Sequence, residues 1–314
     1  MIAANFDPLA RLQQWLFEAW VQPLLFSAGW MHYEEQAYDA LEWLPVGVLE
    51  VLLVAVVLGT LQRRWPVEPL ADRAAVRTDI AYTLLHRLGL FPLLAFVVLA
   101  PAFDALEARL RWLGVSRLSV EQWLPDAFDS PVLVFVVYLV ALDAFDYLIH
   151  RGQHRWRWWW ALHAVHHSQR QMTMWSDSRN HLLDDLIRDA LLAGVAIAIG
   201  VPPAQFVLLV VVARLLQNLQ HANLRLRFGR LGERMLVSPS FHRRHHAIGV
   251  GHEGAAHGCN FGVLFPWWDM LAGTADFTPG VEPTGIRDQL DGRDYGRGFW
   301  SQQWRALLRL AGRA

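Results

Sequence analysis

The chain has 314 residues, of which 54% are hydrophobic and 18% are charged, and its net charge is −1 at pH 7. This composition is more apolar than that of soluble globular proteins and indicates an integral membrane protein. A charge this close to neutral argues against a nucleic-acid partner, which would require a strongly basic domain. Cys259 is the single cysteine, so the chain cannot form an internal disulfide or hold an iron–sulfur cluster alone.

The N-terminal segment, residues 1–43, is expected to be amphipathic and to lie at the membrane interface, mainly through residues 9–30. Its start lacks the basic region and compact apolar core of a secretory signal peptide. We therefore expect the apolar segments that follow to act as their own insertion signals.

Apolar windows of the length needed to span a membrane, about 20 residues, occur at 44–61, 80–102 and 131–149. Two shorter windows, about 186–200 and 203–220, are separated by the sequence VPP and predict a hairpin that either dips into the bilayer or crosses it twice. The sequence thus predicts an all-α integral membrane bundle with about four to five transmembrane or re-entrant helices.

The basic residues predict the orientation, because cytoplasmic loops carry the excess of arginine and lysine. The segment 62–79 holds four arginines, Arg63, Arg64, Arg73 and Arg77. If this segment is cytoplasmic, the second span leaves the cytoplasm and the third returns to it. Every histidine cluster then faces the cytoplasm, in what we expect to be a bacterial inner membrane.

Nine histidines follow the third span in recurring patterns. The first pattern is HxxxH, and it is followed by HxxHH, by a lone histidine after the hairpin and by a second HxxHH. Side chains three or four residues apart share one face of a helix, so the members of each group should converge. The nine are His150, His154, His163, His166, His167, His221, His242, His245 and His246.

A tetrahedral zinc site uses at most about four protein ligands, so nine imidazoles would divide between two metal ions with four or five ligands each. Imidazole suits iron, zinc, copper and nickel, and ligand type alone does not choose among them. Taken alone, the sequence HRRHH could instead be a basic patch on lipid headgroups. His32 and His86 are expected to be core or interfacial residues rather than ligands.

Tryptophans accompany the histidines where the third span ends and again after the last histidine group. Indole rings prefer the headgroup level of a membrane, so we expect them to hold the histidine cluster at the membrane surface. These residues are Trp156, Trp158, Trp159, Trp160, Trp267 and Trp268.

Over residues 131–275 this arrangement resembles the fatty acid hydroxylase and sterol desaturase superfamily, which comprises membrane-bound non-haem di-iron oxygenases. In that family the same histidine motifs supply the metal ligands, and the resemblance assigns that role to the nine histidines given above. The chain departs from the pattern at Gln217, where some members begin a further HxxxH pair. His181 resembles an arginine–x–histidine element of the family, without the proline that often follows it.

Other residues are expected to support the ligands without binding metal. Metal-bound imidazoles usually donate their second N–H to a carboxylate or carbonyl, which favours Asp146, and Asp177, Asp184 and Asp185 are further candidates. The glycine-rich loop with His252 and His257 could close over the metals or be a polar surface loop. The residues assigned to this supporting role are His181, Asp146, Gln217, Asn223 and Asn260.

The resemblance implies an O₂-dependent oxidoreductase with two iron ions, which hydroxylates or desaturates a C–H bond of a lipid, sterol or similar apolar substrate. Electrons would come from a separate ferredoxin, cytochrome or reductase, which we expect to dock on the arginine-rich surface around 225–234. The alternatives are a zinc-dependent membrane hydrolase and a non-enzymatic metal or haem carrier.

The implied segments are an interfacial part (1–43), two spans (44–130), a catalytic domain (131–275) and a cytoplasmic tail (276–314).

Overall fold

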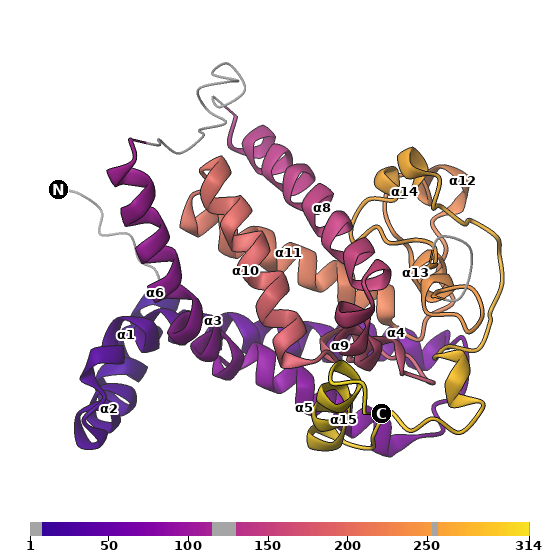
Figure 1. The fold of residues 1–314 in the computed structure, drawn as a ribbon, viewed down its shortest axis with the longest axis horizontal. Coiled ribbons are helices and arrows are strands. Elements are labelled where there is room, and N and C mark those ends of the chain that lie inside the picture. The colour runs from indigo at the N-terminus through magenta and orange to yellow at the C-terminus, as the bar shows by residue number, and fades with distance from the viewer. Residues whose placement is uncertain (1–7, 115–129, 253–256, 314) are drawn as a thin grey trace. The chain divides into compact units, whose positions relative to one another are not determined.

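The computed structural model describes residues 8–114, 130–252 and 257–313 (Figure 1). Within these ranges the regular structure is helical, apart from one isolated antiparallel bridge between Ala247 and Thr284. The predicted all-α class is confirmed. Small parts of the four predicted segments, at 1–7, 115–129, 253–256 and 314, lie outside the described residues.

Three helical stretches in the described residues are long and apolar enough to cross a membrane: Met31–Arg64, Leu90–Trp112 and Pro131–Arg155. The first contains the predicted window 44–61 but begins earlier. The third contains the window 131–149 and continues through the first two histidines of the series. The chain is therefore a membrane protein whose first histidine pair lies on the last turns of a candidate span.

The second candidate span begins at Leu90, which is later than the start of the predicted apolar window 80–102. The structure divides that window between α5 (Arg73–Arg87) and α6 (Leu90–Trp112). Gly89 has a φ of 87°, a left-handed conformation that interrupts a right-handed helix and that glycine adopts at little cost. The continuous helix therefore starts at Leu90, and a count of apolar residues could not detect the break.

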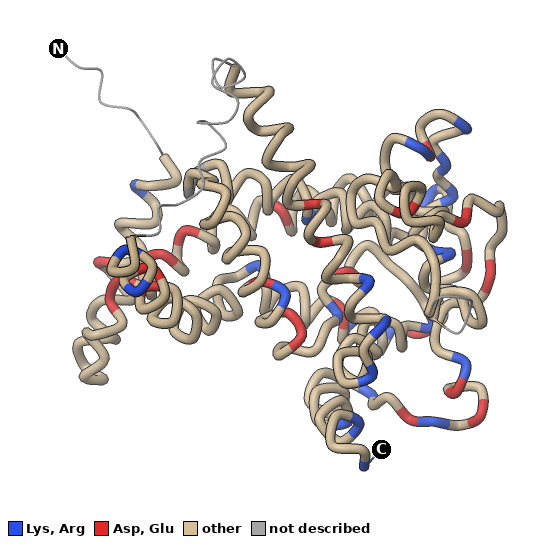
Figure 2. The backbone as a smooth tube through the Cα atoms, turned by 45° about the horizontal axis from the view of Figure 1, so that its top comes forward, with Lys and Arg blue, Asp and Glu red and all other residues tan. Residues whose placement is uncertain are grey.

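The predicted hairpin forms two helices, α10 (Leu182–Ile199) and α11 (Pro203–His221), separated at Gly200, which has a φ of 79°. Neither helix is among the candidate spans. Charged residues occur in the first half of α10, and residues 190–199 and 203–213 have none. Residues 131–142 of α8 (Pro131–Arg155) are also uncharged, and the tan stretches of the tube in Figure 2 are those without charged residues.

The chain forms two compact units, of which the first comprises residues 1–53 and 84–116. It contains α1 (Pro8–Leu16), α2 (Gln22–Ala28), α3 (Glu34–Leu53) and α6. A Cβ atom on Gly47 would lie 1.7 Å from the Arg87 carbonyl oxygen, so only glycine permits this close approach of the backbone. Nearby, the buried side chains of Glu50 and Arg87 form an ion pair at 3.5 Å.

The second unit comprises residues 54–83 and 117–314 and contains all nine histidines of the series. Its helices include α8, α10 and α11, most of α5, and the following shorter ones: α4 (Gly59–Arg64), α9 (Arg157–His167), α12 (Gly229–Gly232), α13 (Pro239–His245), α14 (Trp267–Ala272) and α15 (Phe299–Leu310).

Local sequence signals fix the ends of the histidine-bearing helices. At Trp156 the backbone becomes extended, so that α9 starts as a new helix and packs against α8. Ser238 caps the start of α13, and its hydroxyl accepts a hydrogen bond from the Phe241 amide at 3.1 Å. This is the preferred N-cap arrangement, and Pro239 suits the first helical position.

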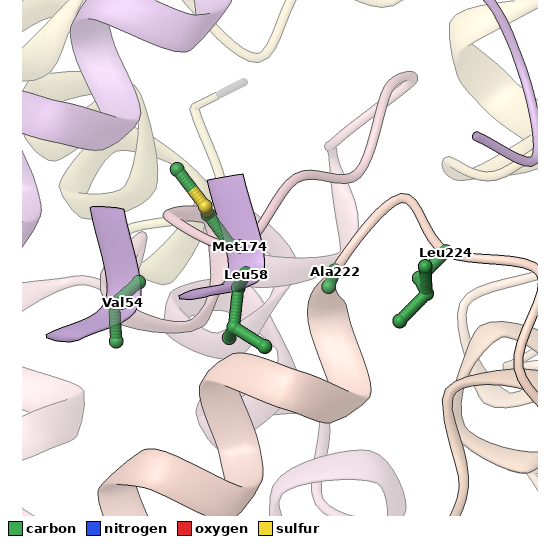
Figure 3. Packing of buried hydrophobic residues seen from close by; sticks show 5 residues of the cluster. All are labelled: Val54, Leu58, Met174, Ala222 and Leu224. Carbon is green, nitrogen blue, oxygen red and sulfur yellow. The ribbon is translucent and has the colours of Figure 1, made fainter. Parts of the chain in front are cut away.

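A buried apolar cluster holds three distant parts of the second unit together (Figure 3). Val54 and Leu58 come from the helical turn before α4, and Met174 comes from the loop after α9. Ala222 and Leu224 follow the C-terminal end of α11 directly. The cluster therefore fixes the place where α11 ends, one residue before Ala222, at His221.

Candidate metal centre

Eight of the nine histidines form two compact groups, each with four ring nitrogen atoms within 4.8 Å of one another. We call them cluster A and cluster B. Cluster A draws on α8, α9 and α13, and cluster B draws on α9, the end of α11, α13 and the residue after it. Cluster A is His150, His154, His167 and His245, and cluster B is His166, His221, His242 and His246.

The two clusters lie against each other. The rings of His167 and His246, one from each cluster, stack with centroids 4.4 Å apart and planes 16° apart. His166 of cluster B also lies 4.7 Å from His246 and 5.5 Å from His167, measured between ring centroids. The arrangement can therefore hold two metal ions side by side.

The spacing of the nitrogen atoms fits metal coordination. In cluster B, the Nε2 atom of His221 lies 3.1 Å from that of His166 and 2.9 Å from that of His242. In cluster A, the Nε2 atoms of His154 and His167 are 3.1 Å apart. Two ligands at about 2.1 Å from one ion, at right or tetrahedral angles, are roughly 3.0–3.4 Å apart.

Backbone carbonyl groups orient one imidazole in cluster B and two in cluster A. The Nδ1 atoms of His150 and His245 lie 2.8 Å and 2.7 Å from the carbonyl oxygens of Phe261 and Cys259. Nδ1 of His221 lies 2.9 Å from the carbonyl oxygen of Gln217, one helical turn earlier. Because a carbonyl can only accept, Nδ1 carries the proton in each ring, and Nε2 presents its lone pair as a metal ligand does.

His163 belongs to neither cluster but contacts both. Its ring centroid lies 5.3 Å from those of His150 and His166. Its Nδ1 lies 3.0 Å from Oδ2 of Asp184, and its Nε2 is buried with no hydrogen-bond partner. A buried polar atom without a partner is costly, and a ninth metal–nitrogen bond would satisfy it.

Burial keeps the imidazoles neutral, which is the form that binds metal. Burial lowers the pKa of His245 to about 3. Burial first, and neighbouring imidazoles second, also hold the pKa values of four other histidines of the two clusters well below the usual range of histidine. These are His166, His167, His242 and His246.

Asp184 is the carboxylate that directly supports a histidine. Besides His163, it accepts hydrogen bonds from Gln153 Nε2 at 2.8 Å and from Trp159 Nε1 at 2.6 Å. The sequence favoured Asp146 for such a role, but the structure pairs Asp146 with Arg188 of α10. Asp177 lies near cluster B, with Oδ1 3.6 Å from Nδ1 of His221.

The other residues that the sequence assigned to a supporting role form hydrogen bonds with backbone groups. His181 caps α10 by accepting a hydrogen bond from the Leu183 amide at 3.1 Å. Asn223 Oδ1 accepts from the amides of Val67 and Glu68, at 3.0 and 3.1 Å. Asn260, with a φ of 57°, donates through Nδ2 to the carbonyl oxygens of Phe241 and Asp276, at 3.0 and 2.9 Å. The backbone carbonyl oxygen of Gln217 lies 2.9 Å from Nδ1 of His221.

The tryptophans that follow α8 divide into two pairs. Trp156 and Trp158 are about half exposed, and their place at a membrane surface stays a prediction. Trp159 is buried against Asp184, and Trp160 stacks on His252 with centroids 3.4 Å apart. His252 in turn lies 5.7 Å from His154 between ring centroids, so the glycine-rich loop reaches cluster A.

Sequence reasoning did not find the carbonyl groups of Cys259 and Phe261 as partners of histidine. A backbone oxygen has no residue-type signal, so the sequence could not have revealed this function. Asp143 lies within a candidate span, and its side chain is buried and hydrogen-bonded. Its carboxylate accepts hydrogen bonds from the Leu264 and Phe265 amides at 2.7 and 3.1 Å.

Comparisons with known proteins agree with this geometry. Residues 135–274 match the family model described as "Fatty acid hydroxylase". The ornithine lipid hydroxylase OlsE of Rhizobium tropici is 28% identical over 237 residues, which cover 75% of this chain and 68% of that protein. An alkylglycerol monooxygenase of Caenorhabditis elegans is 30% identical over 152 residues, which cover 47% of this chain and 28% of that protein. No solved structure matches the chain. Residues 135–274, which match this family model, carry every histidine of both clusters.

Proposed function

We propose that the chain is a membrane-bound non-haem di-iron oxygenase that hydroxylates a C–H bond of a membrane lipid. The observation that supports this most strongly is the pair of adjacent, buried, all-histidine clusters at the end of a candidate membrane span. When bound there, a pair of iron ions would supply reductive activation of O₂ and abstraction of hydrogen from an unactivated C–H bond.

The protein's own residues would hold and orient that pair. Clusters A and B provide four nitrogen ligands each, and His163 provides a ninth at the place where the clusters meet. The carbonyl groups of Cys259, Phe261 and Gln217 fix the direction of three ligands. The clusters are buried, which keeps bulk water away and the ligands neutral.

Hydroxylation is favoured over desaturation, because the two relatives are named as a hydroxylase and a monooxygenase. Both names also specify a lipid, which supports a lipid substrate here. A zinc hydrolase is less well supported, because neither cluster contains a carboxylate that could activate water. The electrons would come from a separate protein donor, since the chain's single cysteine cannot hold an iron–sulfur cluster.

The metal centre is proposed to face the cytoplasm of a bacterial cell from the inner membrane. Arg63 and Arg64 end the first candidate span, and Arg73 and Arg77 lie between it and the second. The positive-inside rule predicts that these four arginines are cytoplasmic. A C-terminal green fluorescent protein fusion should fluoresce if this is correct. A non-fluorescent fusion, together with an active C-terminal alkaline phosphatase fusion, would reverse the orientation.

The reaction is tested by lipid analysis of cells grown under ¹⁸O₂. Cells that produce the wild-type chain should contain a lipid with one added ¹⁸O atom. His166→Ala, which removes a ligand of cluster B, should abolish that lipid, and His32→Ala should retain it. An oxygen atom derived from water, or a product formed without O₂, would overturn the proposal.

A further inference from the structure

Large apolar side chains are exposed together around α12 and α14, outside the metal centre. Leu231 and Leu271 are 77% and 80% exposed, and three neighbours in sequence are also exposed. We call this set the apolar patch, and it consists of Leu231, Met235, Leu236, Met270 and Leu271. Soluble surfaces rarely gather such residues without a partner.

The two parts of the patch belong to one structure. Trp267, at the start of α14, donates a hydrogen bond from Nε1 to the carbonyl oxygen of Arg234 at 2.9 Å. The Val237 amide, just after the first part of the patch, donates to the Leu264 carbonyl at 2.9 Å. These bonds link the segment after α12 to the segment before α14.

This structure is anchored to the middle of α8. Asp143 of α8 accepts hydrogen bonds from the Leu264 and Phe265 amides and, at 2.8 Å, from Trp268 Nε1. Residues 263–265 also pack against Leu139 and Val140 of α8. At 1.5 Å per residue, Leu139 lies about 12 Å along α8 from its first residue. The anchoring point is therefore well inside a candidate span rather than beyond its end.

We propose that the apolar patch inserts into the same bilayer that α8 crosses, as a monotopic contact beside the span. Its leucine and methionine side chains would enter the acyl chains, and the exposed Arg230 and Arg234 would extend to the headgroups. The inference rests on α8 crossing the membrane and is independent of the metal chemistry. The occupant of the patch is lipid, because the segment that carries Met270 and Leu271 is hydrogen-bonded to the middle of a candidate membrane span.

The segment that carries the second half of the patch also supports the metal centre. The carbonyl groups of Cys259 and Phe261 orient His245 and His150 of cluster A, and Met270 follows nine residues after Phe261. Lipid contact and ligand orientation thus depend on one short stretch of chain. The same insertion places the arginine-rich segment 225–234 at the membrane, so that a soluble electron donor would have to dock on another face.

Spin labels on single cysteines test the insertion in the full-length protein. Leu231→Cys and Leu271→Cys place labels on the patch, and Met235→Cys gives a third position in case either variant does not fold. Leu290→Cys is the matched control, because Leu290 is a 58% exposed leucine that lies outside the apolar patch. Cys259 is buried, and labelled wild-type protein measures its background.

The measurement is the accessibility of each label to O₂, which concentrates among acyl chains, and to a water-soluble nickel complex. It is made in nanodiscs of phosphatidylcholine and phosphatidylglycerol. Labels on the patch should show an O₂-to-nickel ratio several times that of the label at 290. A ratio equal to that at 290 would place the patch in water, and protection from both reagents would place it in a protein interface. Either result would overturn the proposal.

Discussion

Oδ2 of Asp184 lies 3.0 Å from Nδ1 of His163, the one histidine of the nine that belongs to neither cluster. This contact leaves Nε2 of His163 buried and available where the two clusters meet. A carboxylate in this position fixes the orientation of a ligand and raises its basicity.

Asp184→Asn should therefore weaken metal binding with little change in the fold. Loss of such a supporting partner typically costs about 10–100-fold in metal affinity or activity. Chelator competition on the purified protein measures the affinity. Asp189→Asn, at a carboxylate on the same helix whose side chain is 39% exposed, is the control and should bind metal as the wild type does. Equal affinity in both variants would show that the Asp184 contact has no function in metal binding.

Asp143→Ala should lower the thermal stability in detergent, because it leaves the buried Leu264 and Phe265 amides and the partly buried Trp268 indole N–H without an acceptor. Each unsatisfied buried group costs about 1–3 kcal/mol. Trp268→Phe removes only one of these donors and leaves the carboxylate with two, so its effect should be smaller. Asp104→Ala, at an exposed carboxylate of α6, should melt as the wild type does. An unchanged melting temperature for Asp143→Ala would contradict the proposed anchoring role.

The ion pair between Asp79 of α5 and Arg179 is buried on both sides, with side chains 0% and 5% exposed. Arg179→Ala should therefore destabilise the protein by about 3–5 kcal/mol, because it leaves Asp79 charged and buried without its partner. The free energies of unfolding of the single variants and of the double variant Asp79→Leu/Arg179→Met measure how much the pair contributes to stability. The double variant should recover part of the loss.

The exposed pair of Arg305 and Asp294, with side chains 37% and 55% exposed, is the control for that experiment. Its removal should cost at most about 1 kcal/mol, because solvent screens an exposed pair. If removal of either pair lowered the free energy of unfolding by the same amount, burial would not be the reason for the strength of the Asp79–Arg179 contact.

The sequence predicted much of this architecture because its signals are local. The apolar windows located α8, α10 and α11, and the histidine spacing placed His150 and His154 together in cluster A. The spacing could not predict that His166 and His167 would serve different clusters. Neighbouring helix residues point about 100° apart, and only the positions of the other helices decide which cluster each one joins.

Contacts between distant segments could not be predicted for the same reason. Asp146 lies one turn before His150 in α8, which favoured an interaction between them, but Arg188 of α10 binds the carboxylate instead. The break at Gly89 is a backbone conformation rather than a change in hydropathy. Neither feature leaves a pattern in the sequence around it.

The most direct test of the central claim is the metal content of anaerobically purified protein, compared across variants of the two clusters. The wild-type chain should contain two iron ions, His154→Ala and His246→Ala should each lose at least one, and His32→Ala should keep both. Stoichiometric zinc in fully active wild-type protein, or iron content unchanged by both cluster substitutions, would contradict a di-iron centre built from clusters A and B.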